Sequence, residues 1–473
     1  MASTVAIIAG AIIAIIYVSL RFLLYCTQDA REPPAIETDQ YRLPIYTLRL
    51  PFQRIYVVNS TGLIPELQKQ WRSVSFAAIA AAAGSVVGMS KDALRIMHQD
   101  LTSEHGFSVS WPHFIAPSMA PGKELDAITR RSVEVLSAEM ESMRTQGGPV
   151  RTGLWAWSRQ IMEAATTEAV WGPQNPYRDA GIAKAWRHAS SSPPPCSNTC
   201  GTVATKLPRE WSASVMSITM AYLVWVRTTL RAGELGNAFA VLSNTAPCAW
   251  WVLYHIFSDA QLLDEIRHEL SAAVYEDENH VWHVDMARLL AACPLLLGTF
   301  QETMRYHAVN PGPRVILKDV VLNDGTLLKK GSILMIPTTV QHTDTTAWGD
   351  DADQFDHLRF SRTAGANGRK KPNRIAFRPF GGGQFLCPGR HFASNEILAV
   401  TALAVLQFEV VPVGGKWVEP TVENSPPQSA FPLPDEDIQV EFRPRDPKKA
   451  WDVTFSGVDQ PMGIVSEDAV ADS

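Results

Sequence analysis

The sequence is short of cysteine, and its cysteines do not come in closely spaced pairs. Six cysteines are spread over 473 residues, at positions 26, 196, 200, 248, 293 and 387. Disulfide scaffolds and zinc ribbons need cysteines at short, regular intervals, so both are disfavoured. Cys196 and Cys200 stand in a Ser/Pro-rich stretch that supplies no further ligands, so we expect no metal there.

Excess positive charge, low-complexity linkers and long repeats are also missing. The formal net charge of -6 at pH 7 argues against a polyanion-binding protein, and so against nucleic acid as a partner. The length would allow three average domains, but no linker splits the interior, which favours one large domain. With 46% hydrophobic and 19% charged residues, the chain can bury a sizeable core.

The one long uncharged apolar run lies near the N-terminus, at residues 5–20, and apolar residues resume after Arg21. A helix of about 20 such residues spans the hydrocarbon layer of a bilayer. A cleaved signal peptide is the alternative, but no side-chain cation precedes the run and no clear cleavage site follows it. We therefore expect a transmembrane anchor over residues 1–27 and a proline-containing linker over residues 28–50.

Arginine follows this apolar run, at Arg21 and Arg31, and none precedes it. The positive-inside rule then leaves the main domain in the cytoplasm. We expect a single-pass membrane protein of the endoplasmic reticulum, with membrane lipid as one of its partners.

Helical periodicity dominates the rest of the chain. It recurs over residues 92–99, 125–144, 160–170, 238–270 and 295–306. Strand-like runs beside Gly or Pro occur at residues 53–58, 314–321, 332–340 and 438–442. The sequence thus predicts a mainly α protein with small β-sheets (α+β).

Two segments show no such periodicity. Residues 189–205 are expected to be irregular, either as a plain solvated loop or as a mobile lid over a substrate entrance. Residues 450–473 are expected to form a loose C-terminal tail.

The most informative segment is RPFGGGQFLCPGRH, from Arg378 to His391, followed by an apolar helical pattern. Glycines let backbone approach a flat cofactor, and amides at a helix N-terminus stabilise a thiolate at Cys387. A thiolate on haem iron donates electron density that favours cleavage of the O–O bond. The alternative is an inert, buried cysteine in a Gly-rich turn.

The pattern Phe380-x-x-Gly383-x-x-x-Cys387-x-Gly389 resembles the haem-binding signature of the cytochrome P-450 superfamily. The resemblance implies haem b, with Cys387 as the metal ligand and Phe380, Gly383 and Gly389 as cofactor-binding residues. It also implies the helical fold of that superfamily behind the membrane helix, with a haem-thiolate catalytic domain over residues 51–449.

A second set of elements stands upstream in the superfamily's order. Glu302 and Arg305 match its E-x-x-R element, and Arg359 would complete a structural triad with them. Glu141 and Arg144 have the same spacing. Only the first pair is followed in the expected order by Pro311, Arg314, His342, Trp348, Phe355, Arg359 and the cysteine loop. By the resemblance, Arg314 would bind a haem propionate.

Three positions depart from the superfamily's pattern. His357 and Leu358 replace the usual Pro-Glu pair before an Arg-Phe, and Phe385 replaces an Arg or His that usually contacts a propionate. A phenyl ring cannot donate that hydrogen bond. Arg314, Arg390 or His391 would have to compensate.

Residues 241–257 form an apolar run with a proline, Pro247, that should kink a helix. In the resemblance this is the oxygen-side helix, where most members carry an acid and a Thr in place of Ala246 and Pro247. The pattern Asn244-Thr245-x-Pro247 is similar to the branch that holds sterol 7-hydroxylases and prostacyclin synthase. Asn244 and Thr245 are therefore candidate catalytic residues, and the alternative for each is a local packing bond.

The resemblance implies hydroxylation of a lipophilic small molecule with O2 and electrons from NADPH, delivered by a flavoprotein reductase. The basic run at residues 368–374 is a candidate docking site for that reductase or else a plain solvated loop. The end of the cysteine loop is similar to fungal members that tailor terpenoid or polyketide natural products. A reductase-independent isomerase or dehydratase, or a haem-binding relative without turnover, are the alternatives.

Overall fold

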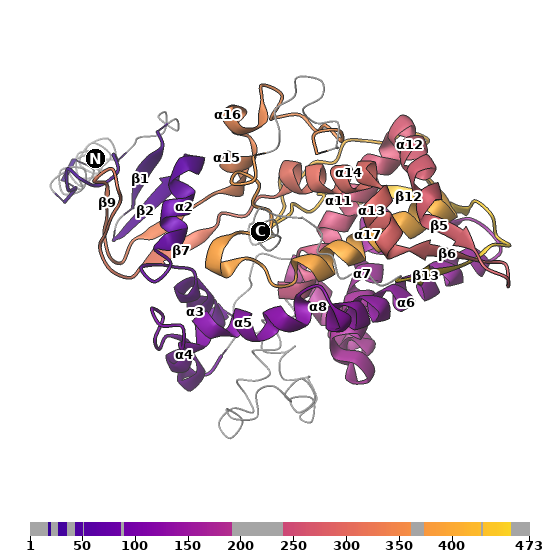
Figure 1. The fold of residues 1–473 in the computed structure, drawn as a ribbon, viewed down its shortest axis with the longest axis horizontal. Helices are drawn as coiled ribbons and strands as arrows, with labels where there is room; N and C mark the ends of the chain where they lie inside the picture. Colours follow the sequence, from indigo (N-terminus) through magenta and orange to yellow (C-terminus); the bar gives the residue numbers. More distant parts are fainter. Residues whose placement is uncertain are drawn as a thin grey trace, which may run out of the picture. The chain divides into compact units, whose positions relative to one another are not determined.

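The structure is a computed structural model, and it describes residues 18–19, 27–35, 43–50, 52–86, 89–191, 240–360, 373–426 and 429–455. The chain expected as one large domain divides into two units (Figure 1). The first comprises the residues up to 79 and residues 312–337, and the second comprises residues 80–311 and those from 338 onward. The boundary at Ile79 falls within helix α3 (Ala77–Val86).

The first unit is built on a five-stranded sheet with the order β1-β2-β10-β7-β3. Its strands are β1 (Ile45–Leu50), β2 (Gln53–Val58), β10 (Ile333–Met335), β7 (Pro313–Ile316) and β3 (Val74–Ser75). β10 pairs with β2 in parallel, and the other neighbours are antiparallel. The turn η1 (Thr61–Leu63), helix α2 (Ile64–Lys69) and the hairpin of β8 (Val320–Val321) and β9 (Leu327–Leu328) complete this unit.

The segment before this sheet is fixed to it by Glu32, whose side chain is fully buried. Its carboxylate lies 2.9 Å from Lys329 Nζ and 3.2 Å from Arg54 Nε, and it accepts a 3.0 Å hydrogen bond from the Tyr56 hydroxyl. The segment predicted as a linker over residues 28–50 is therefore partly built into the fold, and its last six residues form β1. The residues of this ion cluster lie far apart in the sequence, so composition alone does not reveal the contact.

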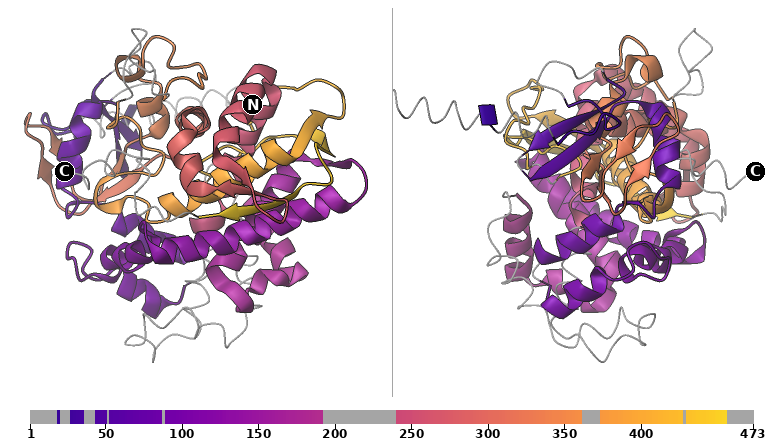
Figure 2. Two further views of the ribbon diagram at one scale, coloured as in Figure 1. Left: turned by 45° about the vertical axis from the view of Figure 1, so that its right-hand side comes forward. Right: turned by 90° about the vertical axis from the view of Figure 1, so that its left-hand side faces the viewer.

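The second unit is mainly helical, and α6, α7, α11 and α17 pack against one another around its core. Figure 2 shows α17 beside α6. The helices are α4 (Lys91–Met97), α5 (Phe107–Met119), α6 (Lys123–Thr145), α7 (Leu154–Trp171), α8 (Ala180–Ser191), α11 (Thr245–Ser258), α12 (Ala260–Leu270), α13 (Met286–Ala292), α14 (Pro294–His307), α15 (Thr338–His342), α16 (Thr345–Trp348) and α17 (Arg390–Gln407). Short 3-10 turns are η2 (Gly172–Gln174), η3 (Pro176–Arg178), η6 (Ser271–Ala273) and η7 (Gly383–Phe385).

Two three-stranded sheets belong to this unit, with the orders β11-β12-β4 and β13-β6-β5. Their strands are β11 (Phe408–Pro412), β12 (Gln439–Pro444), β4 (Val150–Gly153), β13 (Ala450–Thr454), β6 (Val281–Asp285) and β5 (Val274–Glu276). A mainly helical chain with small sheets confirms the predicted α+β class.

Several element boundaries differ from those that periodicity predicts. The helix expected over residues 238–270 is broken at Asp259, whose side chain accepts a 3.1 Å hydrogen bond from the Leu262 amide and caps α12. The strand expected over residues 332–340 ends at Met335, and helix α15 begins at Thr338. Between them stands Pro337, which cannot donate to a sheet.

The prediction of a loose tail over residues 450–473 is wrong for its first five residues. They form β13, which pairs in parallel with β6. Val453 is buried, and the rings of Trp451 and Trp282 lie 6.0 Å apart. So few residues give too short an alternating hydrophobic pattern to indicate a strand beside the polar residues that follow.

Among the described residues, no helix combines the length and the apolar character that a membrane crossing requires. The anchor expected over residues 1–27 lies outside the described residues, except for residues 18, 19 and 27. Most of the irregular segment expected at residues 189–205 also lies outside them, and residues 189–191 end helix α8 instead.

Candidate haem-thiolate site

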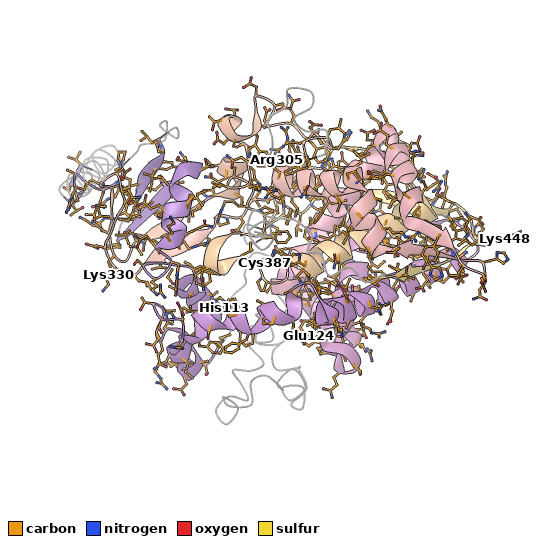
Figure 3. All side chains as sticks on the ribbon, viewed as in Figure 1. His113, Glu124, Arg305, Lys330, Cys387 and Lys448 are labelled. Atoms are coloured by element: carbon orange, nitrogen blue, oxygen red, sulfur yellow. The ribbon has the colours of Figure 1, made fainter. Side chains whose placement is uncertain are left out.

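Cys387 lies on a short loop that closes back on itself just before α17 (Figure 3). Its backbone amide donates a 3.1 Å hydrogen bond to the Phe380 carbonyl. Within the loop, the Leu386 amide donates to Gly383 and the Gly381 amide donates to Arg378. These bonds fix the backbone from Arg378 to Cys387, so that the thiol has a defined position.

The surroundings of Cys387 act on its thiol in two directions. Burial raises the pKa of the Cys387 thiol, while the Gly389 amide and the Arg390 guanidinium act to lower it. The Arg390 side chain also donates a 3.3 Å hydrogen bond to the Cys387 carbonyl. Because α17 begins at Arg390, the amides of its first turn add positive potential here. A metal cation at the sulfur would displace the proton outright.

Two other cysteines in the described part of the chain differ from Cys387. Cys248 and Cys293 are fully buried, while Cys387 is partly exposed. Burial raises the pKa of Cys293 to about 12 and that of Cys248 as well, and within the described ranges no neighbouring cation or amide opposes this at either residue. Of the three, Cys387 is therefore the one suited to bind a metal ion.

The glycines of the loop serve two different purposes. Gly381 and Gly383 have φ of 81° and 66°, a left-handed conformation that other residues rarely adopt. Gly389 has φ of -82°, which suits any residue, and a Cβ there would meet no described atom within 4 Å. Gly389 thus leaves room for a flat group close to the sulfur, which fits a haem held by Cys387.

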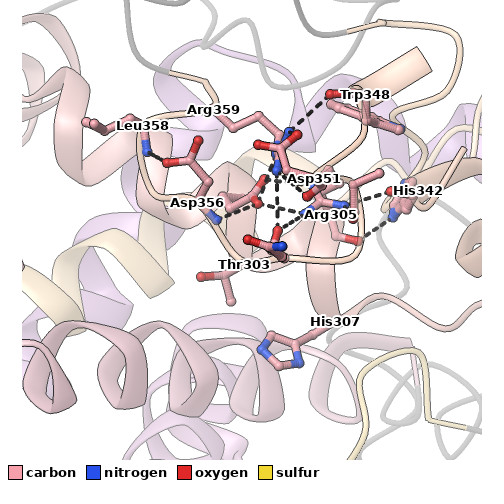
Figure 4. Close-up of polar contacts among 12 residues, drawn as sticks. Thr303, Arg305, His307, His342, Trp348, Asp351, Asp356, Leu358 and Arg359 are labelled. Carbon is pink, nitrogen blue, oxygen red and sulfur yellow. Dashed lines mark hydrogen bonds and ion pairs between the residues drawn. The ribbon is translucent and has the colours of Figure 1, made fainter. Parts of the chain in front are cut away.

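The predicted triad of Glu302, Arg305 and Arg359 is formed in the structure (Figure 4). Glu302 accepts hydrogen bonds of 2.8 and 2.7 Å from Arg305 and one of 3.1 Å from Arg359. Arg305 also donates to the carbonyls of His342, Ala352 and Gln354. The triad therefore ties α14 to the loops that precede the cysteine loop.

The second E-x-x-R pair, Glu141 and Arg144 on α6, has a different setting. The Glu141 side chain is 45% exposed, whereas those of Glu302 and Arg305 are 0% exposed. Arg144 pairs with Glu141 and with the Pro447 carbonyl, and no second arginine reaches that glutamate among the described residues. The order of motifs along the chain therefore selected the correct pair.

Arg314, the predicted propionate ligand, lies on β7 in the first unit. Its guanidinium donates a 2.8 Å hydrogen bond to the Pro313 carbonyl and lies 5.0 Å from the centre of the Phe76 ring. These contacts within the first unit hold the side chain, and its bond to a propionate stays a prediction.

The two candidate catalytic residues stand at the start of α11. The Thr245 hydroxyl donates a 3.1 Å hydrogen bond to the Val241 carbonyl, and Asn244 Oδ1 accepts one of 3.2 Å from the Ala430 amide. A backbone amide can only donate, so Oδ1 must face Ala430, and Nδ2 is left as a donor with no partner among the described residues. Residues 240–242 are helical, residues 243 and 244 form a turn, and α11 begins at Thr245, so the helical run is interrupted just before Pro247, as predicted.

The segment around Ala430 is a part of this region that sequence reasoning missed. Trp251 Nε1 donates a 2.9 Å hydrogen bond to the Pro432 carbonyl, and the Val309 amide donates one of 2.8 Å to Ala430. Asn244 and Trp251 are seven residues apart, so they share one face of α11. That spacing is the one feature of the sequence that points to a contact on this face, and it does not identify the segment around Ala430 as the partner.

Thiolate ligation of haem is the chemistry that the Cys387 loop suits best. Together with the mainly helical second unit and its buried triad, it defines the class of haem-thiolate enzymes.

The comparisons with known proteins agree with this class. The family described as Cytochrome P-450 matches residues 228–442. The cytochrome P-450 monooxygenase nodJ of Hypoxylon pulicicidum is 30% identical, over 90% of this chain and 88% of its own length. A cytochrome P-450 monooxygenase of Gibberella zeae is 24% identical over 85% of this chain and 82% of its own. The monooxygenase calL of Penicillium decumbens is 31% identical over 43% of this chain and 40% of its own.

The chain therefore belongs to the cytochrome P-450 family. It is a haem-thiolate monooxygenase, with a small molecule as substrate and a reductase as partner. The isomerase and the relative without turnover are thereby set aside in favour of the monooxygenase. Phe380, Gly383, Gly389 and Cys387 stand together in one loop, and their contacts with haem stay predictions.

Proposed function

We propose that this monooxygenase hydroxylates a lipophilic small molecule, a terpenoid or polyketide intermediate of secondary metabolism. The proposal is supported by its similarity to fungal monooxygenases over nearly the whole chain and by the nearly uniform apolar burial of α11. The observation that carries it is the Cys387 loop, where one partly exposed thiol stands before a helix N-terminus.

In this proposal Cys387 is the iron ligand, and the backbone of Phe380, Gly383 and Gly389 holds the haem on the cysteine side. When bound, the haem supplies the activation of molecular oxygen, which a thiolate ligand favours. The Gly389 amide and the Arg390 guanidinium stabilise the negative sulfur. Just before α11, Asn244 Nδ2 is the donor that remains available to a polar ligand, since Oδ1 is held by Ala430.

Replacement of the ligand tests this proposal. The reduced, carbon monoxide-bound protein should show the absorption band of thiolate-ligated haem, and Cys387→Ser should lose it. Cys293→Ala is the matched control, because that buried thiol has no role at the site. If Cys387→Ser keeps the pigment and the same band, another residue holds the iron and the proposal is wrong.

The reaction is tested with labelled oxygen. Purified protein, a flavoprotein reductase and NADPH are incubated with a panel of terpenoids and polyketides under isotopically labelled O2. A product that carries one labelled oxygen atom and requires NADPH supports hydroxylation. Turnover without reductase, or products without label, would contradict it.

We propose that the basic run at residues 368–374 docks the reductase by complementary charge. Arg369, Lys370 and Lys371 lie outside the described residues, and Arg374 just beyond them is exposed. Reversing the three charges should slow the first electron transfer, most strongly at low salt, because screening weakens such contacts. An unchanged reduction rate would remove the run from the docking site.

We also propose that residues 1–27 anchor the enzyme in the membrane of the endoplasmic reticulum, with the catalytic domain in the cytoplasm. The uncharged run and the two arginines that follow it support this orientation. In sealed microsomes, added protease should digest the catalytic domain without detergent. Protection of that domain until detergent is added would reverse the topology.

A further inference from the structure

His342, the last residue of α15, lies beside Arg305 of the buried triad (Figure 4) and also contacts the start of the cysteine loop. Its ring is almost fully buried. Nδ1 lies 2.8 Å from the Arg305 carbonyl oxygen, and Nε2 lies 2.9 Å from the Arg378 amide nitrogen. One side chain thus makes a hydrogen bond to α14 with one nitrogen and to the cysteine loop with the other.

The partners of His342 determine where its proton lies. The Arg305 carbonyl can only accept a hydrogen bond, so Nδ1 must carry the hydrogen. The Arg378 amide can only donate, so Nε2 must offer its lone pair. Both bonds exist together in the neutral imidazole alone. Burial and the charges of Arg305 and Arg378 lower the pKa of His342 to about 3, so the ring stays neutral.

Each end of this connection is itself fixed. Arg305 binds Glu302 with two hydrogen bonds and donates a 2.7 Å bond to the His342 carbonyl, which locks the residue to α14. At the other end, the Arg378 carbonyl accepts from the Gly381 amide, and two residues after Arg378 the Phe380 carbonyl accepts from the Cys387 amide. A continuous series of hydrogen bonds and short backbone segments therefore runs from the Glu302–Arg305 ion pair to the backbone of Cys387.

Packing alone does not account for this geometry. The His342 ring lies 5.9 Å from Phe377 and 6.3 Å from Trp348 between ring centres, contacts that a phenylalanine could make equally well. A phenyl ring would leave the Arg378 amide unpaired. An unpaired, buried backbone donor is costly, because it has given up its bond to water and gained none in return.

We propose that His342 is a positioning residue whose two ring nitrogens hold the cysteine loop in register with the Glu302–Arg305 pair, so that the sulfur stays where it binds haem iron. The inference rests on the proposed role of Cys387 as the ligand. In this proposal His342 supports haem retention and thiolate ligation through the position of the cysteine loop, without direct contact to the haem or to the sulfur.

Two variants separate the two nitrogens. In His342→Gln the amide oxygen reaches the place of Nε2 and can accept from Arg378, and in His342→Asn the amide nitrogen reaches the place of Nδ1 and can donate to Arg305. Each variant retains one of the two hydrogen bonds. A third variant, His342→Phe, retains the ring and loses both bonds.

We expect His342→Gln to keep the thiolate band of the reduced carbon monoxide complex, because the backbone carbonyl of residue 342 still accepts from Arg305 and ties the residue to α14 when the Nδ1 bond is lost. His342→Asn and His342→Phe should convert much of that band to the form of haem without a thiolate, and release haem to excess apomyoglobin about ten to a hundred times faster, the range that an unpaired buried donor gives. Far-ultraviolet circular dichroism checks that all three variants are folded.

Equal spectra and equal haem release for the Gln and Asn variants would overturn the proposal, and so would a Phe variant with wild-type behaviour. If the Asn and Phe variants do not fold, hydrogen exchange in the Gln variant decides, because its Arg378 amide must remain as protected as in the wild type. Absence of the thiolate band in the wild-type protein would refute the function itself. A normal wild-type band with all variants unchanged refutes His342 alone.

Discussion

At the scale of single residues, burial separates side chains that the sequence makes look alike. Glu302 and Glu141 each stand three residues before an arginine, yet the first is fully buried and the second is 45% exposed. Removing one partner of a buried ion pair costs about 3–5 kcal/mol, because the other charge is left without compensation. A pair with an exposed carboxylate, such as Glu141 beside the buried Arg144, should contribute less, because water screens it.

Glu302→Gln should therefore lower the free energy of unfolding by about 3–5 kcal/mol. Glu141→Gln, at the same spacing on α6, should lower it by less, because the Glu141 carboxylate is exposed and Arg144 keeps its bond to the Pro447 carbonyl. Urea unfolding followed by circular dichroism measures both. Similar losses for the two variants would mean that the triad does not brace the second unit.

Asn244 supports a second prediction at this scale, since its two polar atoms have different tasks. Asn244→Asp keeps an oxygen that can accept from Ala430 and loses the Nδ2 donor, while Asn244→Ala loses both. Hydrogen exchange at the Ala430 amide should accelerate in the Ala variant only. The fraction of electrons recovered in product should fall in both variants, by about tenfold if a charge-assisted bond of 1.5–3 kcal/mol is lost.

Unchanged coupling in both Asn244 variants would remove this residue from the oxygen side and leave it as a tie to the Ala430 segment. A loss of coupling in the Ala variant alone would show that the position of that segment, and no donor, is what the reaction needs.

At the scale of elements, helix α17 is held by a buried acid. Glu396 is fully buried on α17, with the Ser132 hydroxyl of α6 at 2.5 Å and the Thr166 hydroxyl of α7 at 3.1 Å. Burial raises the pKa of Glu396 to about 8, against the hydroxyl hydrogen bonds that lower it. The helix that begins beside Cys387 is thus joined to both neighbours through one carboxyl group that is protonated at neutral pH.

The sign of the pH effect follows from this shift. Between the ordinary pKa of 4.5 and about 8, the folded protein holds a proton that the unfolded chain has released. Stability should therefore fall as pH rises through this window, by about 1.4 kcal/mol per pH unit from this group. Glu396→Gln, which keeps a neutral side chain of the same shape, should remove that slope. The exposed Glu265 gives the control variant, Glu265→Gln, and an unaltered slope in Glu396→Gln would contradict the assignment.

At the scale of the whole molecule, the histidines at 255, 307 and 342 oppose folding in acid. The pKa is lowered to about 3 at His255 and His342, and well below 6.5 at His307, mainly because burial disfavours the charged ring. His255 and His307 also face each other, with their Nε2 atoms 2.8 Å apart, so the pair does not readily hold two charges.

The unfolded chain binds protons at these histidines below pH 6.5, and the folded protein does not. The free energy of unfolding should therefore fall as pH drops from 6.5 toward about pH 5. Uptake of three protons by the unfolded histidines lowers it by up to roughly 4 kcal/mol per pH unit, and Glu396 opposes this slope by the equivalent of one proton. Urea unfolding over this range measures the slope. His255→Gln should reduce it by about one proton, and His98→Gln, at an exposed position, should leave it unchanged.

Local patterns predicted the parts of this protein that depend on neighbours in sequence. The cysteine loop, the buried triad and helices α6 and α14 follow from spacing and periodicity. The parts that were missed depend on partners far along the chain, as with β13 against β6, Asn244 against Ala430 and Glu32 against Lys329. In each case the sequence shows both members, but only the fold shows that they are partners.

The buried Glu32 also decides how much of the N-terminal region can be removed without harm to the fold. A chain shortened to begin at Thr27 retains the carboxylate that neutralises Arg54 and Lys329, and retains β1 at the edge of the sheet. A chain that begins at residue 51, where the catalytic domain was expected to start, exposes β2 as a new sheet edge and leaves two cations without their counter-ion. Such an edge invites self-association, so the place of truncation bears on whether the shortened enzyme stays dispersed in solution.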